Sequence, residues 1–172
     1  EQPGEIRTDT KMLGLTVDAA LEDVARPDVV IVPGGIGSRR IAEDDRWVAW
    51  AREAHAHAQW TTSVCTGALL LGAAGALEGR RATTHWSSVH LLARYGATPV
   101  GDERVVEDGT VITAAGVSAG IDMALTLAAR IAGEDVARAA QLMMEYAPEP
   151  PFAGGTPLTT PPGALERLPE ML

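Results

Sequence analysis

A run of β-branched residues that stops at a Pro-Gly-Gly turn is the feature of the sequence that most restricts the fold. Residues 28–32 (Asp-Val-Val-Ile-Val) form a continuous apolar run, and the turn follows at residues 33–35. A continuous run, unlike an alternating one, is typical of a strand buried on both faces of a parallel sheet. A second strand candidate, residues 60–64, runs directly into Cys-Thr-Gly at residues 65–67.

Helical patterns alternate with these strand candidates. Residues 43–58 place Trp47, Trp50 and Ala54 three or four positions apart, with acidic residues in the first turn, as on an amphipathic helix. Residues 68–77, rich in Ala, Leu and Gly, predict a second helix after the cysteine turn. Further elements are predicted as strands at 98–100, 104–107 and 111–114 and as helices at 87–95, 118–132 and 134–146. This alternation predicts an α/β fold, a three-layer sandwich around a mostly parallel central sheet.

The chain is acidic, which restricts its partners. Its 172 residues include 23 Asp and Glu against 14 Lys and Arg, for a net charge of −9. Nucleic-acid phosphates would repel such a surface, so we expect no nucleic-acid partner. No apolar run approaches the roughly 20 residues of a membrane span, and no secretory signal pattern is present. We therefore expect a cytoplasmic protein with no membrane partner.

Composition changes at residue 148. Residues 1–147 carry the strand and helix signals of one α/β domain, whereas residues 148–172 contain seven prolines and three glycines. We expect this Pro-rich C-terminal tail to drape over the domain or a partner subunit, with Phe152 as its anchor; disorder is the alternative. The chain starts at Glu1 rather than Met, so either its start was processed or an N-terminal part is absent from this sequence.

Cys65 is the residue best placed for chemistry. As the lone cysteine, it excludes a disulfide framework and a Cys-rich metal site. A sharp turn between a strand and a helix would lift its thiol above the sheet edge, where the N–H groups of the helix start favour a thiolate. The alternative role is that of a small buried hydrophobic residue. The position of Cys65 in the sequence favours neither role over the other.

Backbone donors flank the cysteine in this interpretation. Gly34 and Gly35 offer N–H groups without side-chain obstruction, and with the N–H of Thr66 they would bind developing negative charge; a plain turn is the alternative. His85 follows a strand candidate and would either reach the thiol or make a structural hydrogen bond. No cluster has metal-ligand spacing, and no phosphate-binding glycine motif is complete. We therefore expect neither a metal nor a cofactor.

Several motifs resemble, in order and spacing, the DJ-1/PfpI superfamily, relatives of class I glutamine amidotransferase domains. They are VIVPGG, VCTGA and LEGRRATTHW, at residues 30–35, 64–68 and 77–86. Two more, AGIDMAL at 119–125 and EYAPEPPF at 145–152, look most like the isonitrile (isocyanide) hydratase branch. The resemblance implies a flavodoxin-like fold and a homodimer that acts on a small-molecule substrate.

The resemblance also implies roles for individual residues. Cys65 would be the nucleophile, and Gly35 and Thr66 would offer backbone N–H groups beside it. The family's other catalytic group is a carboxylate on an early strand–helix turn. This sequence does not contain that turn, so we expect the first βαβ portion of the domain to be absent from it. Asp18 and Glu22, although acidic and early, do not match that position.

Together these features predict a cysteine-dependent hydro-lyase. It would hydrate an isonitrile to an N-substituted formamide through a thioimidate on Cys65. Two alternatives stay open. Residues 83–86 also resemble the ligand-binding domain of AraC-type transcription regulators, which need a helix-turn-helix region as well. A DJ-1-like stress or redox protein would instead use Cys65 as an oxidisable thiol.

Overall fold

The computed structural model describes residues 4–8 and 11–168, and the chain divides into two compact units, Glu1–Gly120 and Ile121–Leu172. The strands, all in the first unit, are β1 (Gly4–Arg7), β2 (Gly14–Val17), β3 (Val29–Val32), β4 (Trp60–Val64), β5 (Arg81–Ala82), β6 (Thr98–Pro99), β7 (Val105–Asp108) and β8 (Val111–Ala114). Its helical segments are η1 (Leu21–Asp23), α1 (Ser38–Ile41), α2 (Asp45–His57), η2 (Cys65–Gly67), α3 (Ala68–Ala73) and η3 (Trp86–Tyr95).

The main sheet has four strands in the order β3-β4-β8-β7. The first three run parallel, with Val29 opposite Trp60 and Thr61 opposite Val111. β7 pairs antiparallel with β8, so the chain reverses at Gly109 and Thr110 between them. The structure thus confirms the predicted α/β class with a mostly parallel sheet. Because β3 and β4 are parallel neighbours, the turns that follow them lie at the same edge of the sheet.

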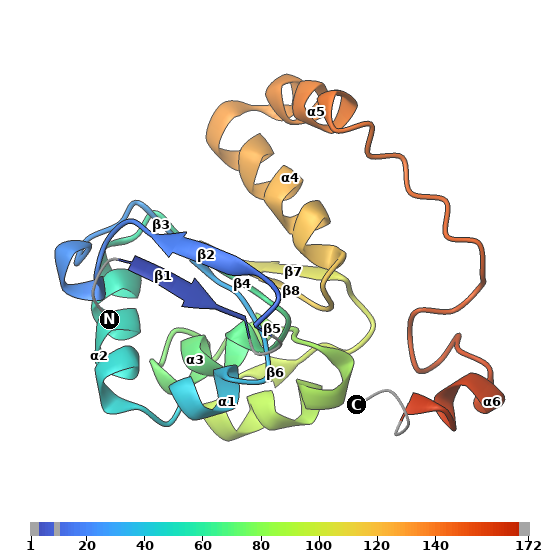
Figure 1. Cartoon of the computed structure of the whole chain (residues 1–172), viewed down its shortest axis with the longest axis horizontal. Coiled ribbons are helices and arrows are strands. Elements are labelled where there is room, and N and C mark those ends of the chain that lie inside the picture. Colours follow the sequence, from blue (N-terminus) through green and yellow to red (C-terminus); the bar gives the residue numbers. More distant parts are fainter. Residues whose placement is uncertain (1–3, 9–10, 169–172) are drawn as a thin grey trace. The chain divides into compact units, whose positions relative to one another are not determined.

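The core of the first unit lies between the sheet and the helices on one of its faces. Figure 1 shows α1, α2 and α3 together on that side of the sheet. Val30 and Val32 of β3 point into this layer and are 3% and 8% exposed. Ala51 and Ala54 of α2 are fully buried in the same apolar cluster. Small residues at these helix positions allow α2 to approach α3 closely.

The central strand β4 is polar but buried. Thr62 donates its hydroxyl to the carbonyl oxygen of Val30 at 3.0 Å, and Thr61 Oγ1 lies 2.8 Å from Nδ1 of His55. Both bonds tie β4 to its neighbours, as buried hydroxyls require. Ser63 Oγ is the exception: it is fully buried and has no hydrogen-bond partner among the residues that the structure describes.

The helix after the cysteine turn is shorter than predicted. It was expected to extend to residue 77, but α3 ends at Ala73. The N–H of Ala76 donates to Leu71 O, and that of Gly75 to Gly72 O, the two bonds of a Schellman motif with glycine at the position after the cap. Gly75 has φ +86°, which favours glycine. The helix therefore stops four residues before residue 77, its predicted end.

Two other elements go beyond what the sequence predicted. Residues 87–95 were predicted as a helix of unspecified type, and Trp86–Tyr95 forms a 3₁₀-helix, with Ser88 N donating to His85 O at 2.8 Å. Over about ten residues, a pattern of apolar positions does not separate three residues per turn from 3.6. The antiparallel hairpin of β1 and β2, in which Ile6 is opposite Leu15, was not predicted as strands.

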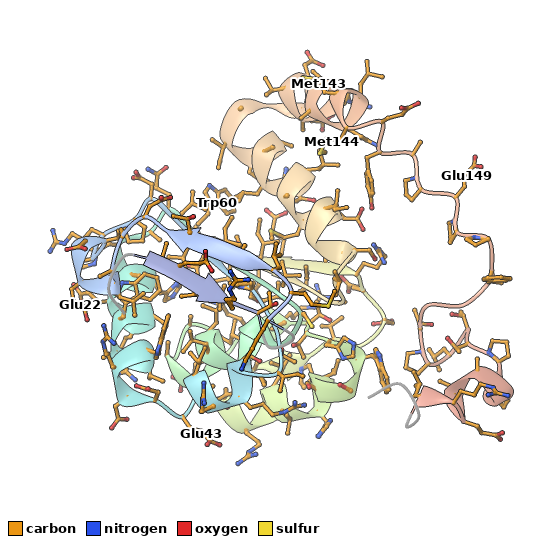
Figure 2. All side chains as sticks on the ribbon, in the orientation of Figure 1. Glu22, Glu43, Trp60, Met143, Met144 and Glu149 are labelled. Atoms are coloured by element: carbon orange, nitrogen blue, oxygen red, sulfur yellow. The ribbon has the colours of Figure 1, made fainter. Side chains whose placement is uncertain are left out.

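The second unit is helical and ends in an extended segment. It contains α4 (Ala119–Ala132) from Ile121 onward, α5 (Glu134–Met143) and the short α6 (Pro162–Leu165). Tyr146 Oη donates to Asp122 Oδ1 at 2.8 Å, and Gln141 Nε2 donates to Tyr146 O at 3.0 Å, which fastens the end of α5 to α4. Met143, labelled in Figure 2, is 89% exposed at the end of α5.

No helix in the part of the chain that the structure describes is long and apolar enough to cross a membrane.

Replacing Gly67 by alanine tests how closely the turn after β4 approaches β3. A Cβ at this position would lie 2.1 Å from Val32 O, which real Cβ atoms do not do. We expect Gly67→Ala to lower the free energy of unfolding by about 2–4 kcal/mol, measured by urea denaturation. Gly37→Ala is the control, because nothing lies within 4 Å of its Cβ and its φ of −70° suits alanine. Equal stability of the two variants would contradict the close approach.

Candidate active site

The two turns that follow β3 and β4 meet at one edge of the sheet. A Cβ placed on Gly34 would lie 2.7 Å from Cys65 Cβ and 2.7 Å from the backbone nitrogen of Thr66. Glycine at position 34 is therefore what allows the first turn to lie against the second. The structure brings together Gly34, Gly35, Cys65 and Thr66, the four residues that the sequence analysis grouped around the nucleophile.

Cys65 has an unusual backbone conformation. Its φ is +56°, in the left-handed region that non-glycine residues rarely occupy. Its side chain is half-buried and carries a free thiol. The carbonyl oxygen of Cys65 accepts a hydrogen bond of 2.6 Å from the hydroxyl of Thr84, which is fully buried. Strain of this kind persists only where the surrounding structure holds it, and it is concentrated at functional sites.

Hydroxyl groups join the two turns. The backbone N–H of Gly35 donates to Thr66 Oγ1 at 3.1 Å, and Ser38 Oγ lies 2.7 Å from both Gly35 O and Thr66 Oγ1. The Gly35 N–H, expected to face a developing negative charge, is thus already engaged by a side chain in this structure. The sequence analysis did not identify Ser38. Its position as the first residue of α1, directly after Gly37, was the signal available.

His85 caps a helix. Its Nδ1 lies 2.8 Å from Ser87 Oγ and also accepts from Ser87 N at the start of η3, and its ring tilts against that of Trp86. These contacts match the structural hydrogen-bonding role, one of the two that the sequence left open. Burial lowers the pKa of His85 below the ordinary 6.5, and the nearby charge of Arg39 lowers it further. His85 therefore lies in the neutral form near neutral pH.

The early carboxylates make no hydrogen bond to the thiol in the described structure. Glu22 forms an ion pair with Arg46 of α2 at 2.6 Å on the exposed surface labelled in Figure 2. This hydrogen bond lowers the pKa of the Glu22 carboxyl. Asp18 is exposed. Within residues 4–8 and 11–168, no carboxylate hydrogen-bonds to the Cys65 thiol, and no three His, Cys, Asp or Glu side chains gather as a metal site needs.

The geometry defines a class of protein: a parallel α/β domain with a strained cysteine on the turn after a central strand. The family model that matches the chain is that of the DJ-1/PfpI family, over residues 2–130. This match covers most of the chain, so the chain belongs to the DJ-1/PfpI family. The predicted flavodoxin-like fold, related to class I glutamine amidotransferases, is confirmed.

Individual relatives agree with this assignment. An isonitrile hydratase of Pseudomonas putida is 48% identical over 159 residues, which are 92% of this chain and 69% of the relative. The crystal structure of a THiJ/PfpI family protein from Pseudomonas syringae superimposes with a TM-score of 0.91 at 38% identity, covering 98% of this chain and 69% of that one. The HTH-type transcriptional regulator CdhR of Pseudomonas aeruginosa is 33% identical over 126 residues, 73% of this chain but 37% of the regulator.

The left-handed backbone of Cys65 predicts an inverted order of stability for two small substitutions. We expect Cys65→Gly to be more stable than Cys65→Ala by about 1 kcal/mol, because only the alanine retains the Cβ that is strained at positive φ. Elsewhere, in helices and strands, glycine is the less stable of the pair. Urea denaturation of both variants measures the difference, and a more stable alanine variant would be incompatible with the strained turn.

The charge of Arg39 predicts a change in the titration of His85. We expect Arg39→Gln to raise the pKa of His85, because a positive charge that disfavours the imidazolium is removed. The pKa should stay below 6.5, since burial is the larger cause and remains. An NMR titration of the His85 ring follows this change. Arg40→Gln removes a neighbouring exposed arginine as a control, and an equal shift in both variants would rule out the specific effect of Arg39.

Proposed function

We propose that the chain carries the cysteine site of an isonitrile hydratase, a hydro-lyase that converts an isonitrile to an N-substituted formamide. One structural observation carries the chemistry: a half-buried free thiol on a strained turn, with Gly34 packed against the Cβ of the same cysteine. The identity of 48% to the P. putida isonitrile hydratase, over nearly the whole chain, supports the substrate class. The reaction divides one addition of water into two easier steps.

In the first step, the Cys65 thiolate adds to the terminal carbon of the isonitrile. A C–S bond forms, and a proton is delivered to the same carbon, which gives a thioimidate with a C=N double bond. A carboxylic acid of the kind that the family uses would deliver this proton. The acid is not assigned to any residue described here, because neither Asp18 nor Glu22 lies at the thiol.

In the second step, water adds to the thioimidate carbon and the nitrogen takes up a proton. The tetrahedral intermediate then gives its hydroxyl proton back to the carboxylate left by the first step and expels the thiolate, so that the C–S bond breaks and the N-substituted formamide leaves. The sum is one isonitrile plus one water, with Cys65 restored. Backbone N–H groups at Gly35 and Thr66 would stabilise the oxygen of this intermediate. The Gly35 N–H would do so while it stays bonded to the Thr66 hydroxyl, shared between that hydroxyl and the oxygen of the intermediate.

Three finer parts of the prediction stay proposals. These are a homodimer, a cytoplasmic location, and a C-terminal tail from residue 148 that covers the domain or a partner subunit. Phe152, the predicted anchor, is 84% exposed, which leaves it available for contact with a second subunit. The roles of Gly34 and His85 as supporting residues are also proposals, and the hydrogen bonds of His85 favour support of η3 over contact with substrate.

Removing the thiol tests the proposed function. We expect Cys65→Ala to abolish turnover of an aryl or alkyl isonitrile, at least a thousandfold, while far-UV circular dichroism stays unchanged. Formamide formation is followed by chromatography. Mass spectrometry of the wild-type protein, quenched during turnover, should show the mass of one isonitrile added at Cys65. This cysteine is unique in the chain, so a thiol adduct needs no further assignment.

Gly37→Ala serves as the matched control, because it changes the neighbouring loop without touching the thiol. Turnover by Cys65→Ala close to that of the wild type would exclude the covalent mechanism. If the wild-type protein turns over no isonitrile but Cys65 oxidises readily with peroxide, the result supports the alternative of a redox protein with an oxidisable cysteine.

A second candidate is the ligand-binding domain of a transcription regulator, favoured by the 33% identity to CdhR. The net charge of −9 opposes DNA binding by this chain itself. A DNA-shift assay with the intact protein, beside the turnover assay, distinguishes the two functions.

A further inference from the structure

We infer that Ser38 is a positioning residue of this site, and this inference rests on the proposed function. Its hydroxyl completes a hydrogen-bonded ring that holds the turn after β3 at a set distance from Cys65. Ser38 is 7% exposed and is not among the residues that the family motifs indicated. No contact joins it to the thiol within the described chain, so it acts through Gly35 and Thr66.

The ring begins and ends on Gly35. Its N–H donates to Thr66 Oγ1 at 3.1 Å, Thr66 Oγ1 lies 2.7 Å from Ser38 Oγ, and Ser38 Oγ lies 2.7 Å from the carbonyl oxygen of Gly35. Both polar groups of one peptide residue are thereby bound to side chains. Such a closed chain of bonds, built on two buried hydroxyls, is more rigid than its separate members.

Each hydroxyl has a single proton and can therefore donate only one hydrogen bond, which leaves two possible sets of donors and acceptors in the ring. In one arrangement Thr66 donates to Ser38 and Ser38 donates to Gly35 O. In the other, Ser38 donates to Thr66, and Thr66 donates to Gly35 O at 3.2 Å. Ser38 takes part in both. Without its hydroxyl, the carbonyl of Gly35 keeps only two longer bonds of 3.2 Å, from the Thr66 hydroxyl and from the backbone N–H of residue 38, and the link between Thr66 and residue 38 is lost.

The close approach of the two turns makes this distance matter. The space at Gly34 is so small that a Cβ would lie 2.7 Å from Cys65 Cβ. A ring that loosens lets the Gly34 and Gly35 backbone move away from the thiol. Reaction rates fall steeply when reacting groups are displaced by less than 1 Å, whereas binding of a distant organic group changes little. The ring should therefore act on kcat rather than on KM.

The expected effects follow from the loss of one hydrogen bond. Ser38→Ala should lower kcat for the isonitrile roughly tenfold and leave KM within about twofold. Ser38→Thr retains the hydroxyl and should restore most of kcat. Thr66→Val removes the hydroxyl that accepts the Gly35 N–H and should lower kcat further. Because both residues act in one ring, the double variant should be no worse than Thr66→Val alone.

Hydrogen exchange of the Gly35 amide gives a readout that needs no substrate. We expect Ser38→Ala to speed this exchange about tenfold, because the acceptor Thr66 Oγ1 is no longer held. Ser63→Ala is the matched control: it also removes a buried serine hydroxyl near Cys65, but one without a hydrogen-bond partner in the described structure. It should change neither the exchange nor kcat. NMR on the intact protein measures the amide directly.

The outcomes separate this inference from the proposed function. Unchanged Gly35 exchange in Ser38→Ala overturns the inference, as do additive effects of the two substitutions on kcat, or a fall in kcat that Ser38→Thr does not reverse. A wild-type protein without isonitrile turnover overturns the proposed function only. In that case faster Gly35 exchange in Ser38→Ala, and not in Ser63→Ala, still supports Ser38 as the residue that positions the turn.

Discussion

The approach of two backbone turns to van der Waals distance is the constraint on which this domain depends. Gly34 lies against Cys65, and Gly67 lies against the carbonyl oxygen of Val32, so each turn carries a glycine where the other passes. The parallel pairing of β3 with β4 sets this register. A shift of one residue in β4 would place Thr66 or Ala68 where Gly67 meets the carbonyl oxygen of Val32, and a side chain would then enter that gap. The same turn residues therefore determine both the packing of β3 against β4 and the surroundings of Cys65.

Strain at the cysteine is balanced by bonds from more distant parts of the chain. The left-handed conformation of Cys65 costs about 1 kcal/mol or more. Against it stand the hydrogen bond from Thr84 to the Cys65 carbonyl and the hydroxyl ring around Thr66. Both use buried hydroxyls, whose bonds are stronger in a region of low dielectric than in water. The site is held by polar groups within an apolar core.

Sequence patterns predicted the elements that bear the site better than the bonds that hold it. The strands before Pro33 and Cys65 were predicted because β-branched runs ending in glycine turns are local signals. The early end of α3 was missed because it depends on a cap at Gly75. The bond of Ser38 to Thr66 joins residues 28 positions apart, and no periodicity reports such a pair. Long-range hydroxyl contacts become visible only once the fold is known.

The hydroxyl ring also separates the fixed part of the loop after β3 from a part that is free to vary. Gly35 and Ser38 are both held by the ring, but Ile36 between them is 81% exposed, and its side chain is not part of the ring. Evolution can therefore change the residue at the tip of the loop without disturbing the backbone beside the thiol.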